Sequence, residues 1–445
     1  MKTKIITTPC GPIEGLVEEN CLIFKGIPYA KAPEGDLRWK APVKKEPFTE
    51  VYPALQFGNR CAQNDRKPTL AEFYGKEFYH GDEEYLNTAI KEDGLFLNIW
   101  APKEIGEKPY PVAFYIHGGA WQGGCGHEKE FRTDAYAKKG VILVTINYRV
   151  NVFGFLSLEE LQEEDPVACG NYGILDQIAA LEWVKENIAS FGGDPDNITI
   201  FGQSAGGMSV STLLSTPYAK GKFEKAIIQS GGGYPNPMDR DISMEESLRR
   251  GHMVMEMAQV STLAELRQLP TERLLEIAGQ MMGIFMGSGK GIPFGSAQNG
   301  LFRTELFDET SALGKQHNVP LMIGTTKDDI FVSPEEAAAR ESRLSKAAIG
   351  LSLIREENGQ IPAYVYYFSR NLPGDDAGAF HSAELWYCFN TLDKCWRPWE
   401  EIDYTLAEDM VCYWTNFMKY GDPNGEGVAP WPMCTKENPF VRILE

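Results

Sequence analysis

The segment FGGDPDNITIFGQSAGG, residues 191–207, joins a short apolar strand to a glycine-flanked serine and the start of a helix. The strand is predicted at 197–201, and the pentapeptide GQSAG (202–206) follows it directly. In a strand–turn–helix context, a G-x-S-x-G turn bends sharply and lifts the serine hydroxyl above the end of a sheet. Taken without its context, the pentapeptide also fits a glycine-rich turn with no chemistry. The flanking strand and helix favour Ser204 as a nucleophile.

A second glycine-rich turn supplies the partner that such a serine needs. The sequence HGGA (117–120) follows a predicted strand at 111–117. Glycines at these positions let backbone N–H groups face a substrate carbonyl. We expect the N–H groups of Gly118, Gly119 and Ala205 to form an oxyanion hole, in which one donor typically contributes about 3 kcal/mol of transition-state stabilisation.

The rest of the chain alternates between strand and helix patterns. Short apolar runs predict buried strands, and apolar residues recurring every three or four positions predict helices. The predicted strands lie at 111–117, 141–147, 197–201, 225–229, 319–324 and 363–368, and the predicted helices at about 173–190 and 404–420. This alternation predicts the α/β class, with a central, mostly parallel sheet covered by helices on both faces.

We expect residues 1–445 to form one domain with a helical insertion at 235–300. Eight of the 14 methionines lie in this insertion. Methionine is unbranched and flexible, so it fills irregular cores and also lines tolerant pockets. Two interpretations therefore stay open, namely ordinary core packing and a wall of the active site.

Composition excludes several classes of protein. The formal net charge of -19 opposes binding to nucleic acid and to anionic membrane surfaces. No apolar run is long enough to predict a transmembrane helix, and the N-terminus lacks the apolar core of a signal peptide. The nine cysteines are odd in number and have no C-x-x-C spacing, which argues against a disulfide framework or a zinc site. We expect a reducing, cytoplasmic location.

Beyond these patterns, the chain resembles the type-B carboxylesterase family, which includes para-nitrobenzyl esterases, mammalian carboxylesterases and cholinesterases. The segment 191–207 is similar to the nucleophile signature of the family, and EDGLFLNIW (92–100) is similar to its second signature. Further similar segments are HGGAWQGG (117–124), NYRVNVFGFL (147–156) and GNYGILDQIAALEWVKENI (170–188). The resemblance runs from about residue 8 to 432. It implies the α/β-hydrolase fold in a short, bacterial-type member.

The resemblance also implies a triad in the order serine, acid, histidine. The family acid lies in a segment like GTTKDDI (324–330), where Asp329 occupies the acid position and Asp328 is its structural neighbour. The family histidine lies in a segment like GAFHSAEL (378–385), which makes His381 the base. Chemistry agrees, because a serine needs a base and the base needs a carboxylate to fix its tautomer.

The other five histidines are less suited to the role of base. We expect His117 to support the oxyanion loop, because it lies at a strand end in the wrong chain order. His127 follows a glycine-rich loop and is expected at most at the rim of the pocket. The remaining three lie in segments without such a role: His80, His252 and His317.

Further family positions carry over as supporting structure. Gln203 and Ser230 are expected to lie just behind the triad. The pairs Arg38 with Glu92 and Arg149 with Asp176 resemble buried ion pairs of the family, and we expect them to fix the fold rather than to take part in chemistry.

The chain departs from the family in three places. Gly94 stands where the family often has a cysteine bridged to an upstream one, so Cys61 cannot form that bridge. Gln203 stands where glutamate is common, which disfavours a strong preference for choline-like cations. Only about 30 residues separate Phe331 from Ile361, where relatives have a longer helical segment, and this predicts a more open site.

We therefore expect a serine carboxylesterase that works through an acyl-enzyme, with no metal and no cofactor. Its partner is a small-molecule ester. Hydrolysis of amides or carbamates on the same triad is an alternative, and a non-catalytic, cholinesterase-like binding module is a less favoured one. The sequence predicts neither the physiological substrate nor the oligomeric state.

Overall fold

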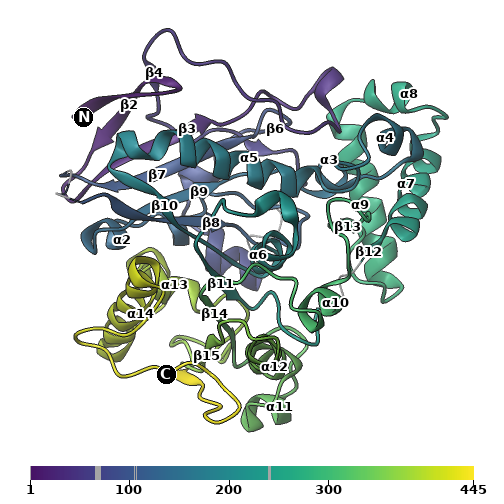
Figure 1. The fold of residues 1–445 in the computed structure, drawn as a ribbon. Helices are drawn as coiled ribbons and strands as arrows, with labels where there is room; N and C mark the ends of the chain where they lie inside the picture. The colour runs from purple at the N-terminus through teal and green to yellow at the C-terminus, as the bar shows by residue number, and fades with distance from the viewer. Residues whose placement is uncertain (1, 66–71, 105, 107, 239–241) are drawn as a thin grey trace.

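The computed structural model describes residues 2–65, 72–104, 106, 108–238 and 242–445, which are drawn as a ribbon in Figure 1. Within these residues, twelve strands form one large sheet in the order β1-β2-β3-β7-β9-β8-β10-β11-β14-β15-β16, with β4 beside β2. The strands are β1 (Thr3–Thr8), β2 (Gly11–Val17), β3 (Cys21–Pro28), β4 (Tyr52–Pro53), β7 (Phe96–Pro102), β8 (Tyr110–Ile116), β9 (Ile142–Ile146), β10 (Gly193–Gln203), β11 (Lys225–Gln229), β14 (Leu321–Thr326), β15 (Ala363–Phe368) and β16 (Arg442–Leu444).

The sheet has a parallel and an antiparallel part. From β9 to β16 every neighbouring pair of strands is parallel, whereas β1, β2, β3, β7 and β9 pair antiparallel. The prediction of a mostly parallel sheet is confirmed. The N-terminal strands were not predicted. β2 carries a weaker apolar pattern in which buried and partly exposed residues mix, as in a strand near a sheet edge.

Both faces of the parallel part are buried, as the continuous apolar runs indicate. In β8, Val112 and Phe114 pack into one apolar cluster, while Ala113 and Tyr115 pack into another. Because successive strand residues point to opposite faces, these clusters lie on the two sides of the sheet. The first is covered by α5 (Tyr172–Asn187) and α6 (Ala205–Ser215), and the second by α14 (Glu401–Tyr420).

The predicted bounds hold best where polar or turn residues flank an element on both sides. β11 and β15 coincide with the predicted strands at 225–229 and 363–368. The helix predicted at 173–190 ends earlier, at Asn187, and a 3-10 turn follows. The helix predicted at 404–420 begins earlier, at Glu401, because Glu400 and Asp403 form a capping box at its start.

Three helices lie within residues 242–300, where the helical insertion was predicted, and they gather at one end of the molecule in Figure 1. They are α7 (Met244–Ala258), α8 (Leu263–Arg267) and α9 (Thr271–Gly287). The methionines of the insertion have different environments. Met281 is buried in the core, Met282 lines the cavity above Ser204, and Met286 is 61% exposed.

The remaining elements are short or peripheral. The helices are α1 (Glu83–Leu86), α2 (Ala135–Lys138), α3 (Asn151–Phe155), α4 (Glu159–Glu164), α10 (Phe307–Ala312), α11 (Pro334–Ala339), α12 (Arg343–Glu357) and α13 (Leu385–Cys388). Two small sheets pair β5 (Arg60–Cys61) with β6 (Ile90–Lys91) and β12 (Ile242–Ser243) with β13 (Ala297–Gln298). No helix in the described ranges is long and apolar enough to cross a membrane.

Two buried ion pairs lie where the family resemblance implied them. Arg38 Nε donates to Glu92 Oε2 over 2.7 Å, and Arg149 Nη2 donates to Asp176 Oδ1 over 2.7 Å. Neither pair lines the cavity at Ser204. Each pair ties a loop to a distant segment of the chain.

The position without the family cysteine is tightly packed. A Cβ atom at Gly94 would lie 2.6 Å from Cys61 Cα, so a larger residue there would have to displace the backbone. All nine cysteines are free thiols.

Candidate active site

Ser204 occupies a strained turn at the carboxyl end of β10. Its backbone has φ 57° and ψ -123°, a combination that a residue with a side chain rarely adopts. The turn is held by a hydrogen bond from the Ser204 N–H to the Gln229 carbonyl over 2.8 Å. Helix α6 begins at the next residue, so the serine lies at a helix N-terminus. Such strain persists only where surrounding contacts fix it, and it clusters at functional sites.

The glycines of the pentapeptide are required by close packing. A Cβ at Gly206 would lie 2.0 Å from the Ile116 carbonyl oxygen, and one at Gly202 would lie 2.5 Å from the Gly206 carbonyl carbon. Only glycine therefore lets α6 approach the ends of β8 and β10 this closely. This packing directs Ser204 away from the sheet and towards a cavity.

His381 and Asp329 lie side by side although they are far apart in sequence. His381 Nδ1 lies 2.5 Å from Asp329 Oδ1. Asp329 follows β14, and His381 lies in the loop between β15 and α13. Since β14 and β15 are parallel neighbours, their carboxyl ends bring the two loops together. The arrangement leaves the other ring nitrogen of His381, Nε2, free of Asp329.

Asp329 is buried and well supplied with hydrogen-bond donors. Its Oδ2 accepts from the Ser230 hydroxyl over 2.6 Å and from the Thr325 hydroxyl over 2.7 Å. Its Oδ1 also accepts from the Ile330 N–H over 2.8 Å. Burial acts to raise the pKa of Asp329, but the charge of His381 and these hydrogen bonds outweigh it and lower the pKa to about 2. The carboxylate is therefore ionised at neutral pH.

Three backbone N–H groups in the serine turn and in the neighbouring glycine turn have no hydrogen-bond partner among the described residues. They are those of Gly118, Gly119 and Ala205. Gly118 packs against the serine turn, since a Cβ there would lie 2.9 Å from the Gln203 carbonyl oxygen. Unpaired N–H groups at a helix start and an adjoining glycine turn suit a developing negative charge.

Ser204, His381, Gly118 and Gly119 all line one cavity of about 460 Å³. This volume fits a small organic substrate. Gln203 also lines the cavity, and its Nε2 lies 3.2 Å from His381 Nε2. Aromatic side chains make up much of the remaining wall, among them Tyr74, Phe78, Tyr79 and Phe131.

The less favoured candidates lie elsewhere or make other contacts. His117 stacks on Tyr148 with 4.3 Å between ring centroids, and its Nδ1 lies 2.8 Å from the Gly118 carbonyl oxygen. His127 is buried against Phe57 and does not line the cavity, so its expected place at the pocket rim is wrong. Asp328 accepts from the Ala379 N–H over 2.7 Å and thus fixes the loop that precedes His381.

Four further residues near the site were not singled out from the sequence. Thr325 contacts Asp329, and its place in GTTKDD, next to the predicted acid, was a usable signal. Glu384 is buried three residues after His381. Glu128 and Glu130 line the cavity, although the run HEKEF (127–131) has the charge pattern of a solvated loop.

The fold and this site define the class of the protein. A parallel sheet that carries a serine elbow at its carboxyl edge, beside a buried Asp–His pair, is the architecture of an α/β-hydrolase. The sequence profile described as Carboxylesterase family matches residues 2–352 and 347–445. The chain belongs to the carboxylesterase family, and it is a serine carboxylesterase that hydrolyses carboxylic esters.

Individual relatives agree with this assignment over the full length. The chain is 32% identical to the para-nitrobenzyl esterase of Bacillus subtilis (strain 168), covering 100% of this chain and 95% of that protein. It is 29% identical to the liver carboxylesterase of Sus scrofa, covering 97% and 86%. Among solved structures, a thermophilic para-nitrobenzyl esterase superposes with a TM-score of 0.84 at 30% identity, covering 99% of this chain and 96% of that one.

Proposed function

We propose that Ser204, His381 and Asp329 form the catalytic triad of this esterase. Ser204 Oγ attacks the ester carbonyl carbon, and its proton passes to His381 Nε2. Asp329, ionised and hydrogen-bonded to Nδ1, holds the ring in the tautomer whose Nε2 is the acceptor and stabilises the imidazolium that forms. The negative charge that develops on the carbonyl oxygen is held by the N–H groups of Gly118, Gly119 and Ala205.

The second half of the reaction reverses these roles. The tetrahedral intermediate collapses, and the leaving alcohol takes the proton from His381. Water then attacks the acyl-enzyme and gives its proton to His381. The second tetrahedral intermediate then collapses: the bond to Ser204 Oγ breaks, Oγ takes the proton back from His381, and the carboxylic acid is released. No step in this sequence calls on a metal or a cofactor.

The buried contact between Asp329 and His381 is the single observation that carries this proposal. It joins two loops 52 residues apart at the edge of the cavity that Ser204 also lines. An ion pair of this kind with no chemical task would place a charge and an imidazole in a costly, buried position. Because His381 lines the same cavity as Ser204, catalysis is the task that explains this buried pair.

Replacement of Ser204 by alanine tests the proposal. Wild type and Ser204→Ala are compared on para-nitrophenyl esters from acetate to laurate. We expect wild type to cleave the short esters and the variant to lose on the order of 10⁶ in kcat, as in other triads. Ser215→Ala is the matched control, because its hydroxyl donates to the Ser211 carbonyl at the far end of α6. Turnover by Ser204→Ala at the wild-type rate would exclude this nucleophile.

The chain length of the ester that is cleaved fastest will indicate how long an acyl chain the pocket accepts. We propose a single domain in which the insertion at 235–300 forms one wall, and Met282 on α9 supports this. On the side of the shortened segment, Phe331 is 85% exposed next to the cavity-lining Ile330, which fits a more open site.

Free cysteines at all nine positions support a cytoplasmic location.

A further inference from the structure

One wall of the cavity at Ser204 is a short segment with an uncommon helical geometry. Residues Gly75–Tyr79 form a single π-helical turn, and the aromatic side chains of Tyr74, Phe78 and Tyr79 line the cavity. Turns of this kind are rare and occur frequently at functional sites. A helix of five residues is too short to be stable by itself, so contacts from other parts of the chain must hold this wall.

Glu77 lies in the middle of this turn, and its side chain is fully buried. Its Oε2 accepts a hydrogen bond from the Trp396 indole N–H over 2.9 Å. Its Oε1 accepts from Arg397 Nε over 2.8 Å, from the Trp386 indole N–H over 3.1 Å and from the Cys395 thiol over 3.4 Å. Indole and guanidinium groups donate hydrogen bonds but do not accept them. A side chain with two acceptor oxygens therefore suits this position, and the charge of Arg397 offsets the cost of burying it.

Arg397 connects this carboxylate to the loop that carries His381. Its Nη1 donates to the Pro373 carbonyl over 2.9 Å and to Asp375 Oδ1 over 2.8 Å. Its guanidinium group also lies 5.4 Å from the centroid of the Phe380 ring. Phe380 directly precedes His381 in the chain. The arginine therefore fixes the segment that leads to the proposed base.

The wall and this loop also pack against each other through their aromatic rings. The rings of Tyr74 and Phe78 each lie 6.3 Å from the ring of Phe380, and both pairs are close to perpendicular. Phe78 also stacks on Trp386, with 5.4 Å between the ring centroids. Edge-to-face and stacked rings add stability beyond the area that they bury. The cavity wall and the histidine loop thus form one packed unit, which the buried ion pair joins.

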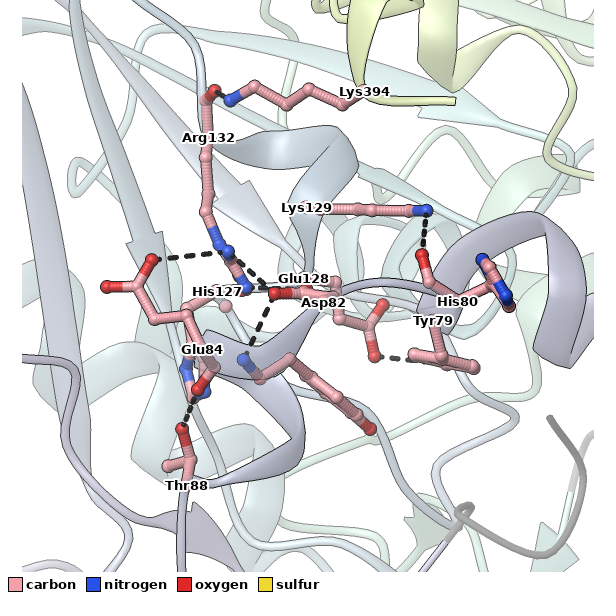
Figure 2. A network of polar contacts seen from close by, with 12 residues as sticks. Tyr79, His80, Asp82, Glu84, Thr88, His127, Glu128, Lys129, Arg132 and Lys394 are labelled. Carbon is pink, nitrogen blue, oxygen red and sulfur yellow. Dashed lines mark hydrogen bonds and ion pairs between the residues drawn. The ribbon is translucent and has the colours of Figure 1, made fainter. Parts of the chain in front are cut away.

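The end of the wall next to His80 is held by other residues, as Figure 2 shows. The Tyr79 hydroxyl donates to Glu128 Oε1 over 3.3 Å, and Lys129 Nζ donates to the His80 carbonyl over 3.1 Å. These contacts attach the end of the wall to the segment that follows the oxyanion loop. The middle of the wall is attached through Glu77.

We propose that Glu77 is a positioning residue of this esterase, which fixes the aromatic wall of the cavity and thereby determines the chain lengths of ester that are bound. The inference rests on the proposed esterase function and adds a determinant of its selectivity. A rigid, preformed wall needs little ordering by the ester that fits, whereas longer esters meet closely packed rings. A mobile wall has to be ordered by the ester that fits, and it yields to the longer ones. Selectivity for chain length should therefore depend on this carboxylate.

Glu77→Gln tests the proposal, because the amide keeps the shape of the side chain but turns an N–H group towards donors of the protein. KM and kcat are measured on para-nitrophenyl esters from acetate to octanoate and on acetates from ethyl to octyl, so that each side of the ester is varied. We expect the KM of wild type to vary by at least about tenfold across one series. In Glu77→Gln this variation should shrink to within about threefold, while kcat on the shortest ester stays within about threefold of wild type.

Glu92→Gln is the matched control for the loss of a buried charge. Glu92 is a buried carboxylate paired with Arg38, and neither residue lines the cavity. This variant should lose stability in urea unfolding without any change in the dependence of KM on chain length. Equal changes of that dependence in Glu77→Gln and Glu92→Gln would overturn the proposal.

Trp396→Phe is a milder second variant, and it decides the question where the amide variant does not fold. It removes one donor to Glu77 and leaves the ion pair with Arg397 in place. The range of KM across the series should narrow in the same direction by a smaller factor. A range equal to that of wild type in every variant at this anchor would overturn the role of Glu77, even with an active esterase. Turnover by Ser204→Ala would instead contradict the proposed triad, and the comparison of KM ranges would still decide the role of Glu77.

Discussion

Asp329 and Glu384 are two buried carboxyl groups near His381, and their surroundings differ. Asp329 accepts hydrogen bonds from two hydroxyls and two backbone N–H groups, in addition to its contact with the imidazole. Neither oxygen of Glu384 has a hydrogen-bond partner of ordinary geometry within the described residues. Burial is nearly complete for both. The supply of donors, and not the depth of burial, therefore separates the two groups.

The consequence is a difference in charge. The pKa of Asp329 falls to about 2, whereas burial and the Asp329 charge raise that of Glu384 to about 8. The charge of His381, a backbone N–H and Gln229 lower the pKa of Glu384 only in part. At neutral pH one of the two groups is ionised and the other is protonated. Of these two carboxyl groups, only Asp329 then carries a negative charge, and this charge orients the ring of His381.

The largest effect expected from this comparison is on kcat in Asp329→Asn. The amide removes the charge that stabilises the imidazolium and allows the wrong ring tautomer. We expect kcat to fall by on the order of 10⁴, with KM for a short ester little changed. Steady-state kinetics on para-nitrophenyl acetate at pH 7 to 8 measure the loss.

Asp328→Asn is the matched control for this change. Its carboxylate accepts from the Ala379 N–H and has no contact with His381 among the contacts described. We expect its activity to stay within about tenfold of wild type, since it positions the loop only. If the two variants lost activity equally, Asp329 would not be the acid of the triad.

The next effect is on stability, in Glu384→Gln. The pKa of Glu384 is about 8 in the folded protein, against an ordinary value of 4.5. Below pH 4.5 the group is protonated in both the folded and the unfolded protein, so its ionisation does not change the free energy of unfolding. Between pH 4.5 and 8 the unfolded state ionises while the folded state holds its proton, so wild type loses stability as pH rises. Glutamine avoids this loss. Its advantage should grow through this window to no more than roughly 5 kcal/mol and then stay constant.

Urea unfolding at several pH values across this window measures that advantage. Glu163→Gln changes the same group at an exposed position and should show no comparable trend with pH. A Glu384→Gln protein whose stability ran parallel to that of wild type at every pH would show that Glu384 ionises in the folded state at its ordinary pKa. The contrast with Asp329 would then disappear.

The sequence predicted the elements that local pattern determines. β11 and β15 were placed to the residue, because their apolar runs are bounded by polar or turn residues on both sides. The serine turn follows from glycine sterics within five residues. The antiparallel strands at the N-terminal end were missed, because their apolar content is diluted by partly exposed positions.

Contacts between residues that are far apart in the sequence were harder to predict. Only the family resemblance paired His381 with Asp329, since the pairing depends on two parallel strands whose order no local pattern fixes. Glu130 was missed for a related reason. A charged residue in HEKEF normally lies in solvent, and its burial arises from segments brought over it from elsewhere in the chain, such as the Thr391 hydroxyl that donates to its carbonyl.

The smallest effect expected is a shift of the pH profile in Gln203→Glu. Gln203 Nε2 lies 3.2 Å from His381 Nε2, so a carboxylate there would favour the imidazolium and raise the pKa of His381. Only neutral imidazole accepts the serine proton. The acid limb of the kcat/KM profile should therefore move to higher pH by about one unit, with the rate at high pH retained. Gln203→Leu brings no charge and should leave the limb in place. A limb that moved equally in both variants would mean that the amide acts through packing and that the added charge has no effect on His381.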